Sequence, residues 1–315
     1  MIERPDIDAL MSGELGEWLT AQAQVRAAAR EESNGRLVKA AFVVLPLAAF
    51  LLFGPGWDIE VKIWLIALAG IASGVWIYAP KAKAIRQTKE GINSALAAAL
   101  GLTYSHDCEP GAGFDRAKLF RMLPGYSRAK FEDKWWGQIG TRAFTLHEAH
   151  LEQKRQSGKN SHYVTVFRGP VMTIAAGRRF HGVTLVERSG KHKKFGLFGE
   201  KDRLEISGLI LDKADMVHPG FEDQFTVYST DQVEARYLVH PGYVEKMIAL
   251  EAAFSGSKIR TLFHEGEVTV VLEVRNMFES GQMDAGRDRE MVAACVAQFM
   301  AMADLAASVS EADRR

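Results

Sequence analysis

Two uncharged apolar stretches, residues 40–57 and 63–80, lie close together in the first quarter of the chain. As a helix rising about 1.5 Å per residue, each would span roughly 27 Å, close to the ~30 Å hydrocarbon thickness of a bilayer. Gly54, Pro55 and Gly56 provide a chain reversal between them. The pattern predicts a transmembrane helical hairpin over residues 37–80. Two buried helices of a soluble protein are the alternative, but such helices normally carry a polar face, which these stretches lack.

Basic residues flank the hairpin on both outer sides, whereas the connecting turn carries only Lys62. Lysine and arginine collect on the cytoplasmic side of short loops, so we expect both termini in the cytoplasm and the turn at residues 58–62 outside. The flanking residues are Arg26, Arg30, Arg36 and Lys39 before the hairpin, and Lys81, Lys83, Arg86 and Lys89 after it.

Gly70 and Gly74 place two small residues four positions apart in the second stretch. This spacing allows two helix backbones to approach closely, so we expect both glycines to pack against another transmembrane helix. The partner is either the first helix of the same hairpin, which the short tether favours, or the hairpin of a second copy of the protein.

The rest of the chain divides into three predicted parts. Residues 1–36 form an N-terminal amphipathic helix in the cytoplasm, with an apolar stripe for packing, for the membrane interface or for a partner. Residues 81–212 contain a stalk helix, which continues to about residue 100, and a β-rich subdomain. Residues 213–315 form a second subdomain of mixed helices and strands.

Strands outnumber helices in the middle of the chain, and the two types do not alternate. The predicted fold class is therefore α+β, a membrane hairpin followed by a cytoplasmic, mostly antiparallel sheet with helices. The expected strands cover residues 138–152, 163–175, 183–188, 204–211, 225–229, 258–264 and 267–274. The expected helices cover residues 114–122, 232–239, 243–254 and 287–308.

The stretch FTVYSTDQVEARYLV, from Phe225 to Val239 and closed by Pro241, resembles a signature of the domain-of-unknown-function 3137 family. Phe167-Arg168-Gly169 resembles another block of that family, and the likeness extends over roughly residues 30–305. The resemblance implies a bacterial protein with an N-terminal hairpin in the cytoplasmic (inner) membrane and a cytoplasmic domain. It implies no activity, because the family has no established catalytic residues.

Within this signature, the residue types indicate structure rather than chemistry. Asp231 and Glu234 have the spacing of a capping box at a helix start. Arg236 is a candidate ion-pair partner. The expected core residues are Phe225, Val227, Tyr237 and Leu238.

Short motifs for catalysis or cofactor binding give little support to an enzyme. His147 and His150 are three apart in a predicted strand, where they would point to opposite faces, so they do not match a zinc-protease helix. His106-Asp107-Cys108-Glu109 contains the residue types of a thiol site, but neighbours in sequence seldom form a triad. We expect no metal site and no cofactor, and two cysteines in the cytoplasm are expected to be free.

The strongest candidate surface is a basic, glycine-containing loop from Arg188 to Lys201. Basic residues near an anionic leaflet contribute about 1 kcal/mol each, so this loop is a candidate for contact with the membrane surface or another anionic ligand. A solvated hairpin tip is the alternative. The candidate contact residues are Arg188, Lys191, Lys193, Lys194, Phe195 and Phe198.

The sequence thus favours a membrane-anchored cytoplasmic binding or scaffold module, with the lipid bilayer and a protein partner or a second copy as its partners. A membrane-tethered enzyme acting on a cytoplasmic or lipid substrate is the alternative. Transport is disfavoured because the two helices carry no charge within the membrane. Formal net charge is zero, so we expect no nucleic-acid partner.

Overall fold

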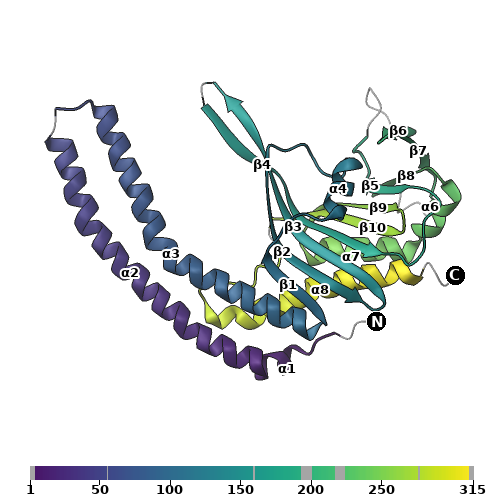
Figure 1. Cartoon of the computed structure of the whole chain (residues 1–315), viewed down its shortest axis with the longest axis horizontal. Helices are drawn as coiled ribbons and strands as arrows, with labels where there is room; N and C mark the ends of the chain where they lie inside the picture. Colours follow the sequence, from purple (N-terminus) through teal and green to yellow (C-terminus); the bar gives the residue numbers. More distant parts are fainter. Residues whose placement is uncertain are drawn as a thin grey trace. The chain divides into compact units, whose positions relative to one another are not determined.

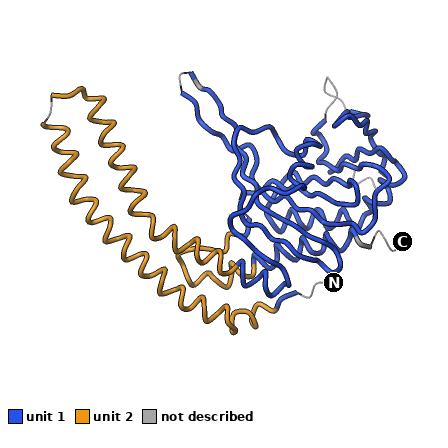
Figure 2. Tube along the Cα trace, in the orientation of Figure 1, with its two compact units in different colours: residues 1–5, 93–278, 294–315 blue, residues 6–92, 279–293 orange. Residues whose placement is uncertain are grey.

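The computed structural model describes residues 4–54, 56–158, 160–192, 201–216, 224–275 and 277–311. It is an α+β structure with one large antiparallel sheet, as predicted (Figure 1). The chain divides into two compact units (Figure 2). The helical unit contains residues 6–92 and 279–293, and the sheet unit contains residues 1–5, 93–278 and 294–315.

Long helices dominate the helical unit. The short helix α1 (Ile7–Ser12) ends at Gly13, so the predicted N-terminal helix is interrupted there. Helix α2 (Glu14–Phe53) has 40 residues and α3 (Ile59–Ala99) has 41, so each continues without a break from the apolar stretch into the flanking polar segment. The 3₁₀ helix η1 (Ala285–Arg287) and the start of α8 (Asp288–Glu311) complete the unit.

The polar ends of α2 and α3 are packed, and the apolar stripe of residues 1–36 is used for this packing. Trp18 lies against Gly91, where an added Cβ would come within 2.0 Å of the Trp18 ring. Arg26, only 1% exposed, forms a two-pronged ion pair with Asp288, with nitrogen–oxygen distances of 2.7 and 2.5 Å. The same guanidinium donates to the carbonyl of Gln282 at 3.2 Å. These contacts tie residues 279–293 to the two helices.

Three described helices are long and apolar enough to cross a membrane, by length and composition. The apolar windows of Glu14–Phe53 and Ile59–Ala99 are 11% and 0% buried. The third, Ala285–Val309, has a window that is 61% buried within the protein. Burial against the protein therefore accounts for the apolar character of the third helix, but not of the first two.

The sheet has ten strands in the order β1-β2-β3-β4-β10-β9-β5-β8-β7-β6, and neighbouring strands are antiparallel. The strands are β1 (Leu102–Asp107), β2 (Arg128–Ile139), β3 (Arg142–Ser157), β4 (Asn160–Ala175), β5 (Thr184–Arg188), β6 (Arg203–Ile206), β7 (Leu209–Ala214), β8 (Phe225–Ser229), β9 (Ser257–His264) and β10 (Glu267–Glu273).

Helices cover both faces of this sheet. On one face, α4 (Ala112–Leu119) places Phe114 against Phe131 and His147. On the other, Phe299 of α8 contacts Trp135 and Phe144. Two further helices, α6 (Gln232–Leu238) and α7 (Pro241–Ala253), connect β8 to β9.

The division of the structure differs from the predicted one. The boundary expected between residues 212 and 213 falls inside β7, and strands from both sides of it belong to the same sheet. Strands β1 and β2 were not predicted, and the strand expected at residues 204–211 is the β6–β7 hairpin. The other expected strands and helices are present within a few residues of the predicted ends.

Candidate functional site

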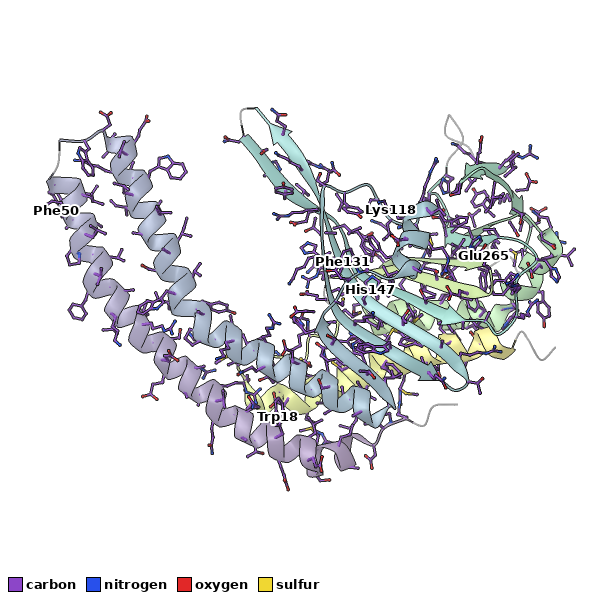
Figure 3. All side chains as sticks on the ribbon, in the orientation of Figure 1. Trp18, Phe50, Lys118, Phe131, His147 and Glu265 are labelled. Atoms are coloured by element: carbon purple, nitrogen blue, oxygen red, sulfur yellow. The ribbon has the colours of Figure 1, made fainter. Side chains whose placement is uncertain are left out.

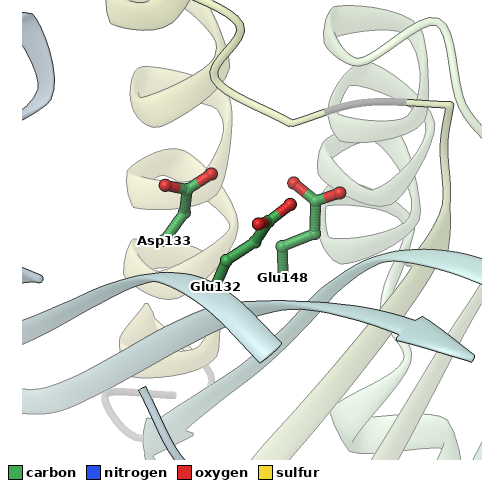
Figure 4. A group of neighbouring side chains, drawn as sticks. All are labelled: Glu132, Asp133 and Glu148. Atoms are coloured by element: carbon green, nitrogen blue, oxygen red, sulfur yellow. The ribbon is translucent and has the colours of Figure 1, made fainter. Parts of the chain in front are cut away.

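Three buried carboxylates lie together on β2 and β3. Glu132, Asp133 and Glu148 are 8%, 0% and 0% exposed, and one oxygen of each lies within 4.8 Å of the others. All three side chains project from the strands toward the face of the sheet that is opposite to α4 and that α8 covers (Figure 4). Buried carboxylates need charged or hydrogen-bonding partners, so the surrounding side chains determine what this cluster can do.

A bulge in β2 brings the three groups together. Glu132 pairs directly with Glu148 across the two strands, and the register then shifts between Glu132 and Trp135. Asp133, within the bulge, has a φ of 56°, which is uncommon for a residue other than glycine. The bulge lets two consecutive acidic side chains point to the same side of the sheet instead of alternating.

Cations neutralise the two glutamates. Arg168 Nε donates to Glu148 Oε1 at 2.5 Å, and Arg168 Nη2 lies 3.5 Å from Glu132 Oε1. Lys130 Nζ donates to the other oxygen of Glu132 at 2.5 Å. Arg168 therefore connects β4 to both carboxylates.

Asp133 has a tyrosine and a histidine as partners, instead of arginine or lysine. Its Oδ1 accepts a hydrogen bond from the Tyr104 hydroxyl at 2.7 Å and lies 3.0 Å from His106 Nδ1. The nearby Cys108 thiol has its pKa raised to about 11, chiefly by burial and, among the neighbouring charges, by Asp133. A thiol with such a pKa is protonated at neutral pH, so this environment does not activate Cys108 as a nucleophile.

The carboxylate oxygens are a donor set that a hard divalent cation accepts. Arg168 and Lys130, however, already engage both oxygens of Glu132 and one oxygen of Glu148. We therefore interpret the cluster as an ion-pair network that joins β1, β2, β3 and β4. This cluster could not be recognised in the sequence, because Glu132 and Glu148 are separated in the chain and only the strand register brings them together.

His147 and His150 do not form a common site. His147 is 5% exposed, its ring packs against those of Phe114 and Phe131, and its Nε2 has no hydrogen-bond partner among the described residues (Figure 3). Burial lowers its pKa to about 4, with a smaller contribution from Lys134. His150 is half-buried, and its Nε2 lies 2.9 Å from the Thr165 hydroxyl. Both lie on β3, where positions three apart point to opposite faces of the strand, as expected.

The basic loop is only partly described. Arg188 forms an ion pair with Glu251. Lys191 forms one with Glu187, whose carboxylate also lies 2.6 Å from His192 Nε2. Glu187 is 1% exposed, and its pKa is lowered by His192 and Lys191 despite the opposing effect of burial. The remaining candidates, Lys193, Lys194, Phe195 and Phe198, lie outside the described residues, and membrane contact by this loop stays a prediction.

Gly70 and Gly74 are exposed on α3, and an added Cβ at either position would meet no atom within 4 Å. We expected these glycines to pack against the first helix of the same hairpin. In the structure, that helix does not pack on them. Residues such as Ile66, Ala69 and Ser73 are the less exposed positions of this segment. Packing of Gly70 and Gly74 against a second copy stays a prediction.

The signature region from Phe225 to Val239 has a structural role. Phe225, Val227 and Leu238 are buried as expected, whereas Tyr237 is 38% exposed and lies outside the core. Asp231 caps α6 by accepting from the backbone N–H groups of residues 233 and 234.

Glu234 does not complete the expected capping box. Its carboxylate accepts from the backbone N–H groups of His181 and Gly182, at 3.0 and 2.8 Å. The Asp231 N–H instead donates to the Ser229 hydroxyl at 3.0 Å. Arg236, the candidate ion-pair partner, donates to the carbonyl of Asp215 at 3.0 Å. Glu234 therefore fixes the segment before β5 rather than its own helix start.

Comparison with known proteins gives one family and one structure. The sequence model of a family described as "Protein of unknown function (DUF3137)" matches residues 165–310. The crystal structure of the mycobacterial trehalose monomycolate transport factor A, TtfA, is similar with 12% sequence identity and a TM-score of 0.32. The similarity covers 69% of this chain and 95% of that one. No curated protein matches the sequence. The match to the DUF3137 family runs from the middle of β4 to the end of α8 and supports the family resemblance predicted from the sequence.

Proposed function

We propose that this protein is a membrane-anchored binding module. In this proposal, residues 37–80 cross the bacterial cytoplasmic membrane as a helical hairpin. Both termini lie in the cytoplasm, where the sheet unit binds a protein or a lipid headgroup.

The proposal rests on the absence of packing around the apolar segments of α2 and α3. Between residues 37 and 80, only Ala40 and Leu51 are buried among the described residues. Large apolar side chains are exposed along both helices, from Leu37 (55%) to Phe53 (89%) and from Ile59 (59%) to Tyr78 (55%). These two segments, as helices, would be about 25 and 30 Å long, which matches the hydrocarbon thickness.

A soluble protein would not leave so continuous an apolar surface in water. Contiguous apolar patches on soluble monomers rarely exceed a few hundred Å². The packed part of the same helices carries polar and charged groups, such as Arg26 and Lys89, in ion pairs with residues of the segment 279–293. The helices thus change from protein packing to an apolar exterior at the predicted membrane boundaries.

The sided distribution of basic residues supports the orientation. Of the eight flanking cations, Arg26 and Lys89 are buried. The other six lie closer to the apolar segments, whereas the turn carries only Lys62. A binding role for the sheet unit is favoured because its buried carboxylates, and its cysteine near them, are held in structural contacts rather than activated.

The proposal is tested by extraction and by sided labelling of the full-length chain in bacterial cells. An integral hairpin should resist extraction by alkaline carbonate. A cysteine introduced at the turn, Glu60→Cys, should react with a membrane-impermeant maleimide in intact cells. A matched cysteine in the sheet unit, Asn160→Cys, should react only after permeabilisation.

Two other results would contradict parts of the proposal. Release of the chain by carbonate would refute the membrane anchor. Labelling of Asn160→Cys in intact cells, with protection of Glu60→Cys, would reverse the orientation.

A further inference from the structure

The β3–β4 hairpin extends beyond the rest of the sheet as a two-stranded ribbon (Figure 1). Strand β2 pairs with β3 only as far as Arg128 opposite Glu152, and β10 pairs with β4 only from Val171 onward. The pairs from Gln153–Val164 to Ser157–Asn160 therefore have no third strand. At about 3.4 Å per residue, the ribbon projects roughly 17 Å past the pair at Glu152.

The ribbon has an unbalanced positive charge. Residues 153–165 contain Lys154, Arg155 and Lys159, together with His162, and no acidic residue. Lys154 and Arg155 are exposed, and the described part of the structure gives neither side chain a hydrogen bond or an ion pair. Lys159 lies outside the described residues. The one acidic group at the base, Glu152, is engaged by Arg128 at 2.5 Å.

Packing does not account for the ribbon. The hydrophobic core on the α4 face reaches Leu151 and Phe167 but no residue between them except the half-buried Val166. Both faces of the ribbon carry exposed polar side chains, and an isolated two-stranded hairpin is only marginally stable in water. The ribbon therefore contributes little to folding and presents its charge on both faces.

Tyr163 adds an amphipathic ring to this charged surface. It is 43% exposed, and the guanidinium of Arg128 lies 3.9 Å from its ring centroid. Tyrosine next to basic side chains is typical of groups at the headgroup level of a bilayer, where the ring is partly buried and the hydroxyl is hydrated.

We propose that this ribbon, residues 153–165, docks on the anionic phospholipid headgroups of the cytoplasmic leaflet. The inference rests on the proposed membrane anchor, which keeps the sheet unit at high effective concentration near that surface. Lys154 and Arg155 supply the attraction, and Tyr163 enters the interface. Each cation contributes about fivefold to the docking equilibrium, and the two together about 25-fold.

The test places an environment-sensitive dye at the ribbon tip of the full-length chain. Asn160→Cys can be labelled selectively near neutral pH, because Cys295 is buried and the thiol pKa of Cys108 is raised to about 11. The labelled protein is placed in phosphatidylcholine nanodiscs with and without 30% phosphatidylglycerol. The same chain without Asn160→Cys gives the background labelling.

Docking predicts a blue-shifted emission in the anionic discs only, and the shift should fall with added salt. The double variant Lys154→Gln and Arg155→Gln should lose it, with about 25-fold weaker docking. A control with the same charge loss elsewhere in the sheet unit should keep it: Lys213→Gln and Lys246→Gln.

Three results would overturn the inference. Equal emission in neutral and anionic discs, or equal loss in both double variants, excludes docking by the ribbon charge. A photo-crosslinker at residue 160 that captures a protein instead of lipid assigns the ribbon to a protein partner. If carbonate extracts the protein from membranes, the anchor is refuted separately. The dye emission of that protein with added anionic vesicles still tests docking by the ribbon.

Discussion

His147 should make the stability of the sheet unit depend on pH in a defined window. Its ring is 5% exposed and packs against Phe114 and Phe131, and burial lowers its pKa from 6.5 to about 4. The unfolded chain binds a proton at this histidine as the pH falls through 6.5, whereas the folded chain does so only near pH 4. Stability is therefore fully present above pH 6.5 and is lost as the pH falls from 6.5 to 4.

The size of the effect follows from the difference between the two pKa values. Each unit corresponds to 1.36 kcal/mol, so protonation of the unfolded chain removes about 3 kcal/mol in total. Between pH 7 and pH 5, the loss is about 2 kcal/mol. For a unit of this size, that corresponds to roughly 4–8 °C in Tm.

The assay compares the free energy of unfolding of full-length protein and His147 variants in neutral detergent, by urea titration at several pH values between 5 and 8. Both His147→Gln and His147→Phe change the packing, which shifts stability by an amount independent of pH. The difference between wild type and either variant should nevertheless change by about 2 kcal/mol between pH 7 and pH 5, because only the wild type carries this titration.

The exposed His162 provides the matched control. Its replacement by glutamine also removes one histidine, but from a side chain that is in contact with water in the folded protein. The pH dependence of His162→Gln should follow the wild type. A difference between wild type and the His147 variants that stays constant from pH 7 to pH 5 would refute the assignment of a buried, neutral histidine.

Two further predictions concern packing and charge. Arg168→Gln should lower the free energy of unfolding by about 3–5 kcal/mol, because Glu148 is fully buried and would lose its cation; urea titration at pH 7 measures this, and a loss below 1 kcal/mol would contradict the ion-pair network. Gly91→Ala should destabilise the helical unit by about 1–3 kcal/mol, because its Cβ would overlap the Trp18 ring, whereas Gly35→Ala, where a Cβ meets no atom, should not; limited proteolysis of α2 compares the two.

Much of the fold could be predicted because local patterns determine it. The apolar stretches at residues 40–57 and 63–80 identify two long helices without reference to the rest of the chain. Asp231 marks the start of α6, because its side chain accepts from the next N–H groups in sequence. Such signals depend on neighbouring residues, so no knowledge of the tertiary contacts is needed to read them.

The first two strands lack such local signals, so they could not be predicted. Strand β2, RAKFEDKWWGQI, carries five charged residues, and a bulge at Asp133 interrupts its alternation. A period of two is therefore absent from the sequence although the strand pairs on both sides. The buried carboxylates depend on the same feature, because only the register of β2 with β3 places Glu132 beside Glu148.

Glu234 shows a similar limit at shorter range. A glutamate three residues after a capping aspartate is typical of a capping box, yet its carboxylate binds the N–H groups of His181 and Gly182. Those partners are about fifty residues earlier, so the local spacing gave the correct helix start but the wrong partner for Glu234.

Charge in the sequence also differs from charge available for binding, as the two basic segments illustrate. If Lys191 reached a membrane, it would gain about 1 kcal/mol. It would leave Glu187, 1% exposed, without one of its partners, and breaking such a buried pair costs about 3–5 kcal/mol. The same comparison applies to Arg188, which would have to break its ion pair with Glu251 to reach a membrane.

The ribbon cations have no comparable cost. Lys154 and Arg155 are exposed without ion pairs in the described structure, so their attraction to an anionic surface is not offset by a buried partner. More of the positive charge is therefore available for binding a partner in the ribbon than in the described part of the loop. The difference arises from Glu187 and Glu251, which neutralise the start of the loop, and the ribbon contains no acidic residue that could do the same.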